Sequence, residues 1–197
     1  MSDSLITKKA IAASLKELMK KKDIARISVA DIAHQCGINR QTFYYHFQDK
    51  FDLINWIYYN DVISAVSEAK KVDDWSEVML DILSDMKRDK TFYSSALKLT
   101  GQNAFQDYFF DVTKKLIAGI INILVEGKNV EEEDKTFIAE FYTFGLVGVV
   151  AQWAKNGMNE TPQELVLRLK HFIDDSKYFA AARYCRDLTQ NNTKLSD

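Results

Sequence analysis

Residues that break helices are scarce along this chain, and their scarcity limits the folds that it can form. Among 197 residues there is one proline, Pro162, and there are seven glycines. Proline and glycine are the residues that most often interrupt helices. Apolar residues recur at helical spacing, and we find no segment that alternates in the manner of a strand. The sequence therefore predicts an all-α fold.

Helical spacing and start signals predict about nine helices. Ser28, followed three residues later by Asp31, has the form of a capping box. Thr161, Pro162 and Glu164 form a second start signal, with proline at the first helical position. The acidic stretch 127–134 is expected to be a loop. The expected helices cover about 5–22, 28–36, 39–47, 49–71, 75–89, 91–99, 104–126, 135–156 and 161–188.

The charge is distributed unevenly between the two ends of the chain. Residues 1–50 carry nine Lys and Arg against five Asp and Glu, a net +4, and the rest carry 17 against 23, a net −6. The two values sum to the −2 of the whole chain. A basic first quarter on an acidic body indicates that this end meets a polyanion.

Cysteine usage and hydropathy predict an intracellular protein without a metal site. Cys36 and Cys185 lie far apart, and neither they nor the three histidines have the spacing of metal ligands. The N-terminal stretch lacks the basic and apolar parts of a signal peptide. The longest apolar run, residues 144–151, is much shorter than a membrane span. We expect a cytoplasmic location and no cofactor.

Two short helices joined by a tight turn stand near the N-terminus. Ala33 is small enough for the helices to cross closely, and Gly37 tolerates the positive backbone angle of such a turn. In the second of the two helices, Phe43 and Phe47 are four residues apart and face the first helix of the chain. This pattern predicts a helix-turn-helix.

The opposite face of that second helix carries side chains suited to DNA. Arg40 and Gln41 can form bidentate hydrogen bonds with guanine and adenine edges in the major groove. Lys50, at the start of the next helix, adds a cation for a phosphate. The hydroxyl groups expected to reach phosphates belong to Thr42, Tyr44 and Tyr45. A purely structural hairpin is the alternative, but it would leave two tyrosines in water without a role.

One segment resembles the DNA-binding domain of the TetR family of transcription regulators: SVADIAHQCGINRQTFYYHFQDKFDL, residues 28–53. The positions that fit the pattern of the family are Gly37, Thr42, Phe43, Tyr44, His46, Phe47, Lys50 and Leu53. Gln41, Phe51 and Ala30 depart from the family, which leaves the operator sequence open. The candidate DNA-binding residues are Ser28, Asn39, Arg40, Gln41, Thr42, Tyr44, Tyr45, His46 and Lys50.

The resemblance also implies two domains and a homodimer. The expected domains are a DNA-binding domain at 1–48 and a helical regulatory and dimerisation domain at 49–197. In this family the last two helices pair with those of a second copy. The candidate dimerisation residues are Gly145, Leu146, Gly148, Val149, Val150, Trp153, Leu165, Leu169, Phe172 and Ile173. The alternative is that these residues pack only within one subunit.

A narrower resemblance concerns the run RQTFYYHFQDKFDLINWIYYND, residues 40–61. It is similar to the branch that regulates dihydroxyacetone kinase operons. Members of that branch are activators, and a kinase-subunit-like partner protein that binds dihydroxyacetone supplies their signal. The resemblance therefore implies a palindromic DNA operator and this co-activator protein as partners.

Two other functions remain open, and enzymatic activity is not expected. The first is a repressor released by a small molecule held among aromatic residues of the fourth to seventh helices, although such aromatics are more often plain core. The second is a helical adaptor for protein interactions. The sequence contains no nucleophile elbow, phosphate-binding glycine loop or paired metal motif.

Overall fold

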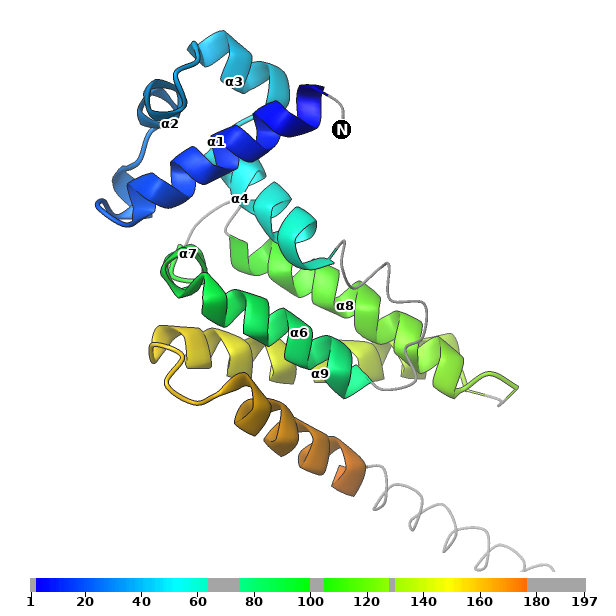
Figure 1. The fold of residues 1–197 in the computed structure, drawn as a ribbon. Coiled ribbons are helices and arrows are strands. Elements are labelled where there is room, and N and C mark those ends of the chain that lie inside the picture. The colour runs from blue at the N-terminus through cyan, green and yellow to red at the C-terminus, as the bar shows by residue number, and fades with distance from the viewer. Residues whose placement is uncertain (1–2, 64–74, 100–104, 128–129, 177–197) are drawn as a thin grey trace, which may run out of the picture.

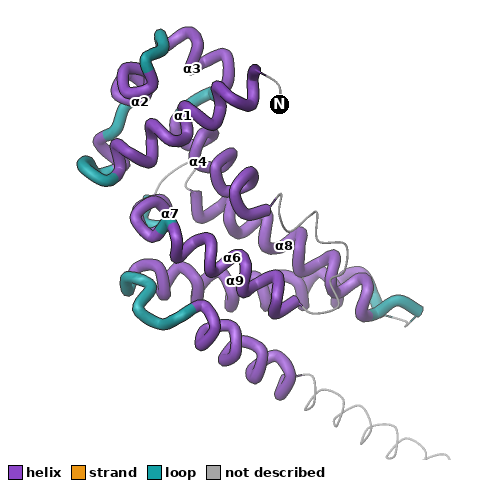
Figure 2. Tube along the Cα trace, viewed as in Figure 1, coloured by secondary structure: helices purple, strands orange, loops and turns teal. Residues whose placement is uncertain are grey.

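The helices are arranged as an N-terminal head and a body joined by one helix. A computed structural model describes residues 3–63, 75–99, 105–127 and 130–176. Figure 1 shows α1, α2 and α3 gathered at one end, α4 leading out of them, and α6 to α9 forming the body. Figure 2 shows that helices and loops make up the described residues and that these contain no strand. The all-α prediction is confirmed.

The elements follow one another in this order. They are α1 (Asp3–Met19), the 3₁₀ turn η1 (Ile24–Arg26), α2 (Val29–Cys36), α3 (Arg40–His46), α4 (Lys50–Tyr58), the π-helical turn η2 (Tyr59–Ile63), α6 (Trp75–Arg88), α7 (Lys90–Ala96), α8 (Phe105–Leu124), α9 (Glu132–Lys155) and a last helix at 162–176.

Some boundaries differ from those predicted. The first helix ends at Met19 instead of residue 22, and α9 begins at Glu132 instead of residue 135. The early start of α9 has a physical reason, because acidic side chains in a first turn are favoured by the helix dipole. The predicted continuations to 71 and to 188 lie partly outside the described residues.

The hydrophobic core is continuous across the predicted domain boundary between residues 48 and 49. Ile11 and Phe43 in the head belong to the same buried cluster as Ile54 of α4 and Phe92 and Trp153 of the body. That boundary falls at the turn between α3 and α4, where no gap in the packing marks it. The head is therefore packed onto the body and is not tethered by a bare linker.

Among the described residues, α9 is the helix whose length and composition would allow it to cross a membrane. Its most apolar window has a mean hydropathy of 1.3, and 39% of that window is buried in the subunit. Helices that pack inside soluble proteins satisfy the same criterion. The exposed side chains include Phe137, Phe141 and Phe144, which are 67%, 62% and 68% exposed. This apolar face of α9 is exposed in the part of the subunit that the structure describes.

The anchoring of α3 can be tested with two substitutions on the same helix. Phe43 is completely buried, so Phe43→Ala is expected to lower the free energy of unfolding by about 3–5 kcal/mol. Tyr45 is 83% exposed, and Tyr45→Ala is expected to change it by about 0.5 kcal/mol or less. Urea denaturation at a fixed protein concentration measures both values. Equal losses for the two variants would contradict this packing.

Candidate nucleic-acid interface

Local hydrogen bonds fix the turn between α2 and α3. Gly37 ends α2 with a φ of 71°, and its N–H donates to the carbonyls of Ala33 and His34. The N–H of Ile38 also donates to the Ala33 carbonyl, at 3.0 Å. Ala33 itself is 2% exposed. The predicted roles of Ala33 and Gly37 are confirmed, since a larger residue or a negative φ would not fit this turn.

Aromatic side chains attach α3 to the rest of the head. Phe43 and Phe47 are 0% and 2% exposed, and their ring centroids lie 5.9 Å apart. The ring of Phe47 meets that of Trp56 on α4 edge to face, with centroids 5.7 Å apart. The ammonium of Lys8 on α1 lies 5.3 Å from the Phe47 centroid, a cation–π contact that the sequence pattern did not reveal. The recognition helix is thus held by α1 and α4 together.

The outer face of α3 presents a group of accessible polar and aromatic tips. Tyr45 is 83% exposed and Tyr44 is 55% exposed, while Arg40 and Gln41 are also exposed. The side chains of Thr42 and His46 are half-buried. Large aromatic rings are rarely left in water without a function, because their burial stabilises a fold. All six side chains are accessible from outside the head, and their contact with DNA stays a prediction.

Ser28 and Asn39 are engaged in helix capping. The hydroxyl of Ser28 accepts from the N–H of Asp31 at 3.2 Å and donates to its carboxylate at 2.8 Å. Asn39 Oδ1 accepts from the N–H of Thr42 at 2.8 Å and from its hydroxyl at 3.0 Å. These bonds satisfy amides at the helix starts. Both residues are exposed, so the predicted DNA contact of each would have to coexist with its cap.

The capping box also lowers the pKa of the Asp31 carboxyl group. The carboxylate of Asp31 accepts from the N–H of Ser28 at 2.8 Å and from the ammonium of Lys22 at 3.0 Å. The bonds from the Ser28 N–H and hydroxyl, followed by that from Lys22, hold the pKa of Asp31 far below its ordinary value. Lys22 is therefore committed to an ion pair at the start of α2.

Lys50 binds the protein's own backbone, and its predicted contact with a phosphate stays a prediction. Its ammonium donates to the carbonyls of Ile24, Ala25 and Ile27 at 2.9, 3.2 and 2.9 Å. A lysine ammonium has three N–H donors, and all three are used here. Partial burial lowers the pKa of Lys50, and the charges of Asp23 and Asp49 partly offset this effect.

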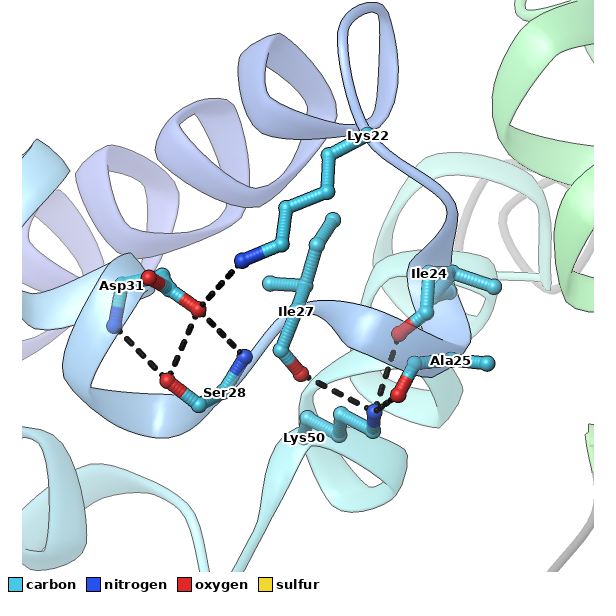
Figure 3. Close-up of polar contacts among 7 residues, drawn as sticks. All are labelled: Lys22, Ile24, Ala25, Ile27, Ser28, Asp31 and Lys50. Carbon is cyan, nitrogen blue, oxygen red and sulfur yellow. Dashed lines mark hydrogen bonds and ion pairs between the residues drawn. The ribbon is translucent and has the colours of Figure 1, made fainter.

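Figure 3 shows how these two clusters flank the segment that leads into α2. Lys50 donates to the carbonyls of residues 24, 25 and 27 on one side, and Asp31 accepts from the N–H of Ser28 on the other. The partners of Lys50 lie 23 to 26 residues earlier in the chain, so no local pattern could have revealed them. Lys50 is a structural clamp that fixes the entry of α2.

The predicted dimerisation residues divide into two groups. Leu146, Val150, Trp153 and Leu165 are between 2% and 8% exposed and form part of the subunit's own core. Their side chains offer little surface in one subunit, and the contact of these four with a second copy stays a prediction. Leu169 packs against the core, and Ile173 lines a cavity. The residues that remain exposed are Gly145, Gly148, Val149 and Phe172.

A largely apolar cavity of about 520 Å³ lies in the body. Its wall includes Tyr58 of α4, Ile82 and Leu83 of α6, Phe109 of α8 and Val150 of α9. Other aromatic residues of these helices, Tyr93 of α7 and Phe105 of α8, are buried core. The aromatic helices thus supply both a core and a cavity of a size that accommodates a small ligand.

The head has the geometry of a DNA-binding regulator: a helix-turn-helix whose second helix is anchored by two phenylalanines and exposes its polar face. Comparison with known families agrees with this class. The model for bacterial regulatory proteins of the tetR family matches residues 11–56, and a model for a transcriptional regulator C-terminal region matches residues 73–175. The chain belongs to the TetR family and is a DNA-binding transcription regulator.

A curated relative narrows the comparison. The chain is 31% identical, over 121 residues, to the HTH-type dhaKLM operon transcriptional activator DhaS of Lactococcus lactis subsp. lactis (strain IL1403). The matched region covers 61% of this chain and 64% of that relative. The protein is thus a TetR-family regulator similar to DhaS.

Solved structures agree with the fold. The dihydroxyacetone kinase operon activator DhaS has a TM-score of 0.68 at 23% identity, covering 87% of this chain and 96% of its own. NalD, the secondary repressor of the MexAB-OprM multidrug efflux pump in Pseudomonas aeruginosa, has a TM-score of 0.55 at 20% identity, covering 85% and 94%. The fatty acid degradation regulator FadR from Bacillus halodurans has a TM-score of 0.55 at 15% identity, covering 82% and 90%.

Replacing Lys50 tests whether it is a clamp or a phosphate contact. Lys50→Met leaves three carbonyls without their donor and is expected to lower the free energy of unfolding by about 1–3 kcal/mol. Lys155→Met, which removes an exposed lysine of α9, serves as the control. The salt dependence of DNA binding, measured by fluorescence anisotropy below the unfolding temperature, should keep its slope. A slope of log affinity against log salt concentration that is shallower by about one unit would support the predicted contact of Lys50 with a phosphate.

Proposed function

We propose that this regulator activates transcription of a dihydroxyacetone kinase operon. Two homodimer-related α3 helices would enter successive major grooves of a palindromic operator, about 34–36 Å apart. The observation that carries the DNA-binding part is the exposed face of α3 on a buried anchor. The sign of regulation and the operon rest on the relative DhaS, which is a transcriptional activator of the dhaKLM operon.

The side chains of α3 have two roles in this proposal. Arg40 and Gln41, both exposed in the first turn, read base edges. The backbone is held by the exposed Tyr44 and Tyr45. Thr42 and His46 act beside them as phosphate contacts. Ser28 and Asn39 support this surface by capping α2 and α3, whether or not they touch the DNA themselves.

The signal is proposed to come from a second protein. A kinase-subunit-like co-activator that binds dihydroxyacetone would stabilise the arrangement of the two heads that matches the operator. In this view the chain works in the cytoplasm as a regulator and not as an enzyme. Its partners are operator DNA, a second copy of itself and the co-activator.

The proposed dimer interface lies on the outer faces of α9 and the helix at 162–176. A Cβ atom added at Gly145 or Gly148 would meet no atom of the same subunit within 4 Å, so packing within the subunit does not require glycine there. Glycines at such positions allow a second helix to approach closely. The large apolar side chains exposed on these two helices are Phe137, Phe141, Phe144, Val149, Leu167 and Phe172. A surface of this kind favours a protein interface.

A second candidate function is a repressor released by a small molecule. The cavity of about 520 Å³ favours it, since its walls from α4, α6, α8 and α9 are largely apolar. In that case a ligand would fill the cavity and lower the affinity for DNA. The two functions differ in the effect of deleting the gene. The transcript of the controlled operon falls if the protein is an activator and rises if it is a repressor.

DNA binding can be tested by gel shift on the promoter next to the gene. Arg40→Ala is expected to weaken specific binding by about 1–3 kcal/mol, because it removes a bidentate contact with a base. Arg88→Ala is the matched control, since Arg88 is an exposed arginine of the body at 78% exposure. Unchanged binding in the Arg40 variant would contradict base reading by α3. A wild-type protein that gives no specific shift would favour the adaptor.

The dimer can be tested with charges on the exposed α9 face. Val149 is 40% exposed, and Val149→Arg would place a charge at the centre of the proposed interface. Light scattering is expected to give the mass of a dimer for the wild type and of a monomer for the variant. Ile6→Arg is the control, because Ile6 is 54% exposed but lies on α1. A dimer that persists in the Val149 variant would rule out this face.

A further inference from the structure

A cluster of three charged side chains joins the head to the body. The ammonium of Lys16 on α1 lies 2.8 Å from Asp61 Oδ2 and 2.7 Å from Asp89 Oδ2. Asp61 belongs to the π-helical turn after α4, and Asp89 stands between α6 and α7. Their positions are 45 and 73 residues beyond Lys16 in the chain. One lysine of the head therefore holds two separate elements of the body.

The surroundings of the cluster favour this pairing over other contacts. Asp89 occupies the N-cap position of α7 but makes no capping bond with its side chain. Its carboxylate is turned to Lys16 instead, at the cost of a cap that would stabilise α7. The other carboxylate oxygen of Asp61 accepts from Asn60 at 3.0 Å, and the Lys16 ammonium lies 5.3 Å from the Phe92 centroid.

The cluster is partly shielded from water. The side chains of Lys16, Asp61 and Asp89 are 25%, 39% and 32% exposed. Burial by itself lowers the pKa of Lys16, but the bonds to the two carboxylates outweigh it and raise that pKa. The ammonium is therefore charged at neutral pH, and both pairs persist together.

Both acidic residues are connected to walls of the cavity. Tyr58 lines the cavity and stands three residues before Asp61, at the end of α4. Ile82 and Leu83 line it from α6, whose last residue, Arg88, precedes Asp89. A change in the shape of the cavity walls would therefore shift Asp61 and Asp89, the two partners of Lys16.

Residues Tyr59–Ile63 form a π-helical turn, wound with about one residue more per turn than an α-helix. Single turns of this kind are rare and occur frequently at functional sites. A shift of one residue into α-helical winding would rotate Asp61 by about 100° around the axis. That rotation would carry its carboxylate away from Lys16 and leave Asp89 as the remaining partner. A two-state element of this kind is what coupling between distant sites requires.

We propose that Lys16 is a positioning residue, whose pairs with Asp61 and Asp89 set the orientation of the DNA-binding head on the body. The π-helical turn is the element whose rearrangement weakens this hold. The effect on DNA rests on the proposed dimer, because the separation of two recognition helices depends on how each head sits on its body. When the body changes shape, the two ion pairs of Lys16 would move the head, and the distance between the two recognition helices would change with it.

The DNA measurement compares operators of different spacing. The probes are duplexes that contain the operator mapped by footprinting on the neighbouring promoter, with and without one base pair inserted at the centre. The insertion is expected to weaken wild-type binding about tenfold, since it displaces and rotates one half-site. In Lys16→Met and Asp61→Asn the same insertion should cost less than about threefold, because loosened heads adjust to the altered site.

The control is Lys20→Met, in the turn directly after α1. Lys20 pairs with Glu17 at the end of α1, so its loss removes an equal charge without affecting the contact between head and body. In the Lys20 variant the inserted base pair should weaken DNA binding about tenfold, as in the wild type. Circular dichroism at the measuring temperature checks that each variant is folded.

A distance measurement tests the same claim without relying on the dimer. Spin labels at Gln35→Cys on α2 and Lys155→Cys on α9, both exposed positions, report the placement of the head. The background carries Cys36→Ser and Cys185→Ser, and dilution with unlabelled protein isolates distances within one chain. The distribution should be narrow in the wild-type background and in Lys20→Met, and broader in Lys16→Met.

The two readouts separate the two proposals. A narrow distribution and an unchanged spacing penalty in a folded Lys16 variant would overturn the positioning role. Suppose that the inserted base pair does not change the affinity of the wild type, while Lys16→Met still broadens the distribution of spin-label distances. The dimer proposal then fails, and the positioning of the head by Lys16 is supported.

Discussion

The burial of Phe43 and Phe47 against α1 and α4 is the interaction on which the rest of this molecule depends. A helix of seven residues such as α3 is too short to be stable alone in water. These two rings provide the packing that keeps it folded, and their spacing of four leaves the opposite side of the helix for other contacts. Tyr44 and Tyr45 can remain exposed there because the anchor does not require them.

Several lysines of the head serve the fold, although a basic segment first suggests contacts with DNA. Lys50 clamps three carbonyls before α2, Lys22 pairs with the capping carboxylate of Asp31, and Lys16 reaches two acids of the body. The net charge of +4 over residues 1–50 therefore overstates the charge available to phosphates. The candidate DNA-binding surface consists mainly of polar and aromatic side chains on α3. Side chains of this kind position a helix on DNA by specific hydrogen bonds more than by general electrostatic attraction to phosphates.

Local signals allowed much of the head to be predicted, and contacts between distant residues accounted for what was missed. The box at Ser28 and the turn at Gly37 each depend on neighbours within five residues, so the sequence alone reveals them. The partners of Lys50 and Lys16 lie 23 or more residues away, where no periodicity points to them. Trp153, which was predicted at the dimer interface, is 6% exposed in one subunit. Because α9 is apolar on several sides, its pattern does not distinguish the face toward its own subunit from the face toward a second copy.

The proposed function depends most on one contact, that between the exposed face of α3 and DNA. Photo-crosslinking tests it most directly, with p-benzoylphenylalanine in place of either Tyr45 or Tyr59 and a duplex of the neighbouring promoter. Both tyrosines are accessible, at 83% and 51% exposure, but Tyr59 lies beyond α4 and outside the head. A covalent protein–DNA product from position 45 and none from position 59 is the predicted result. A product from position 59 alone, or equal products from both, would contradict it.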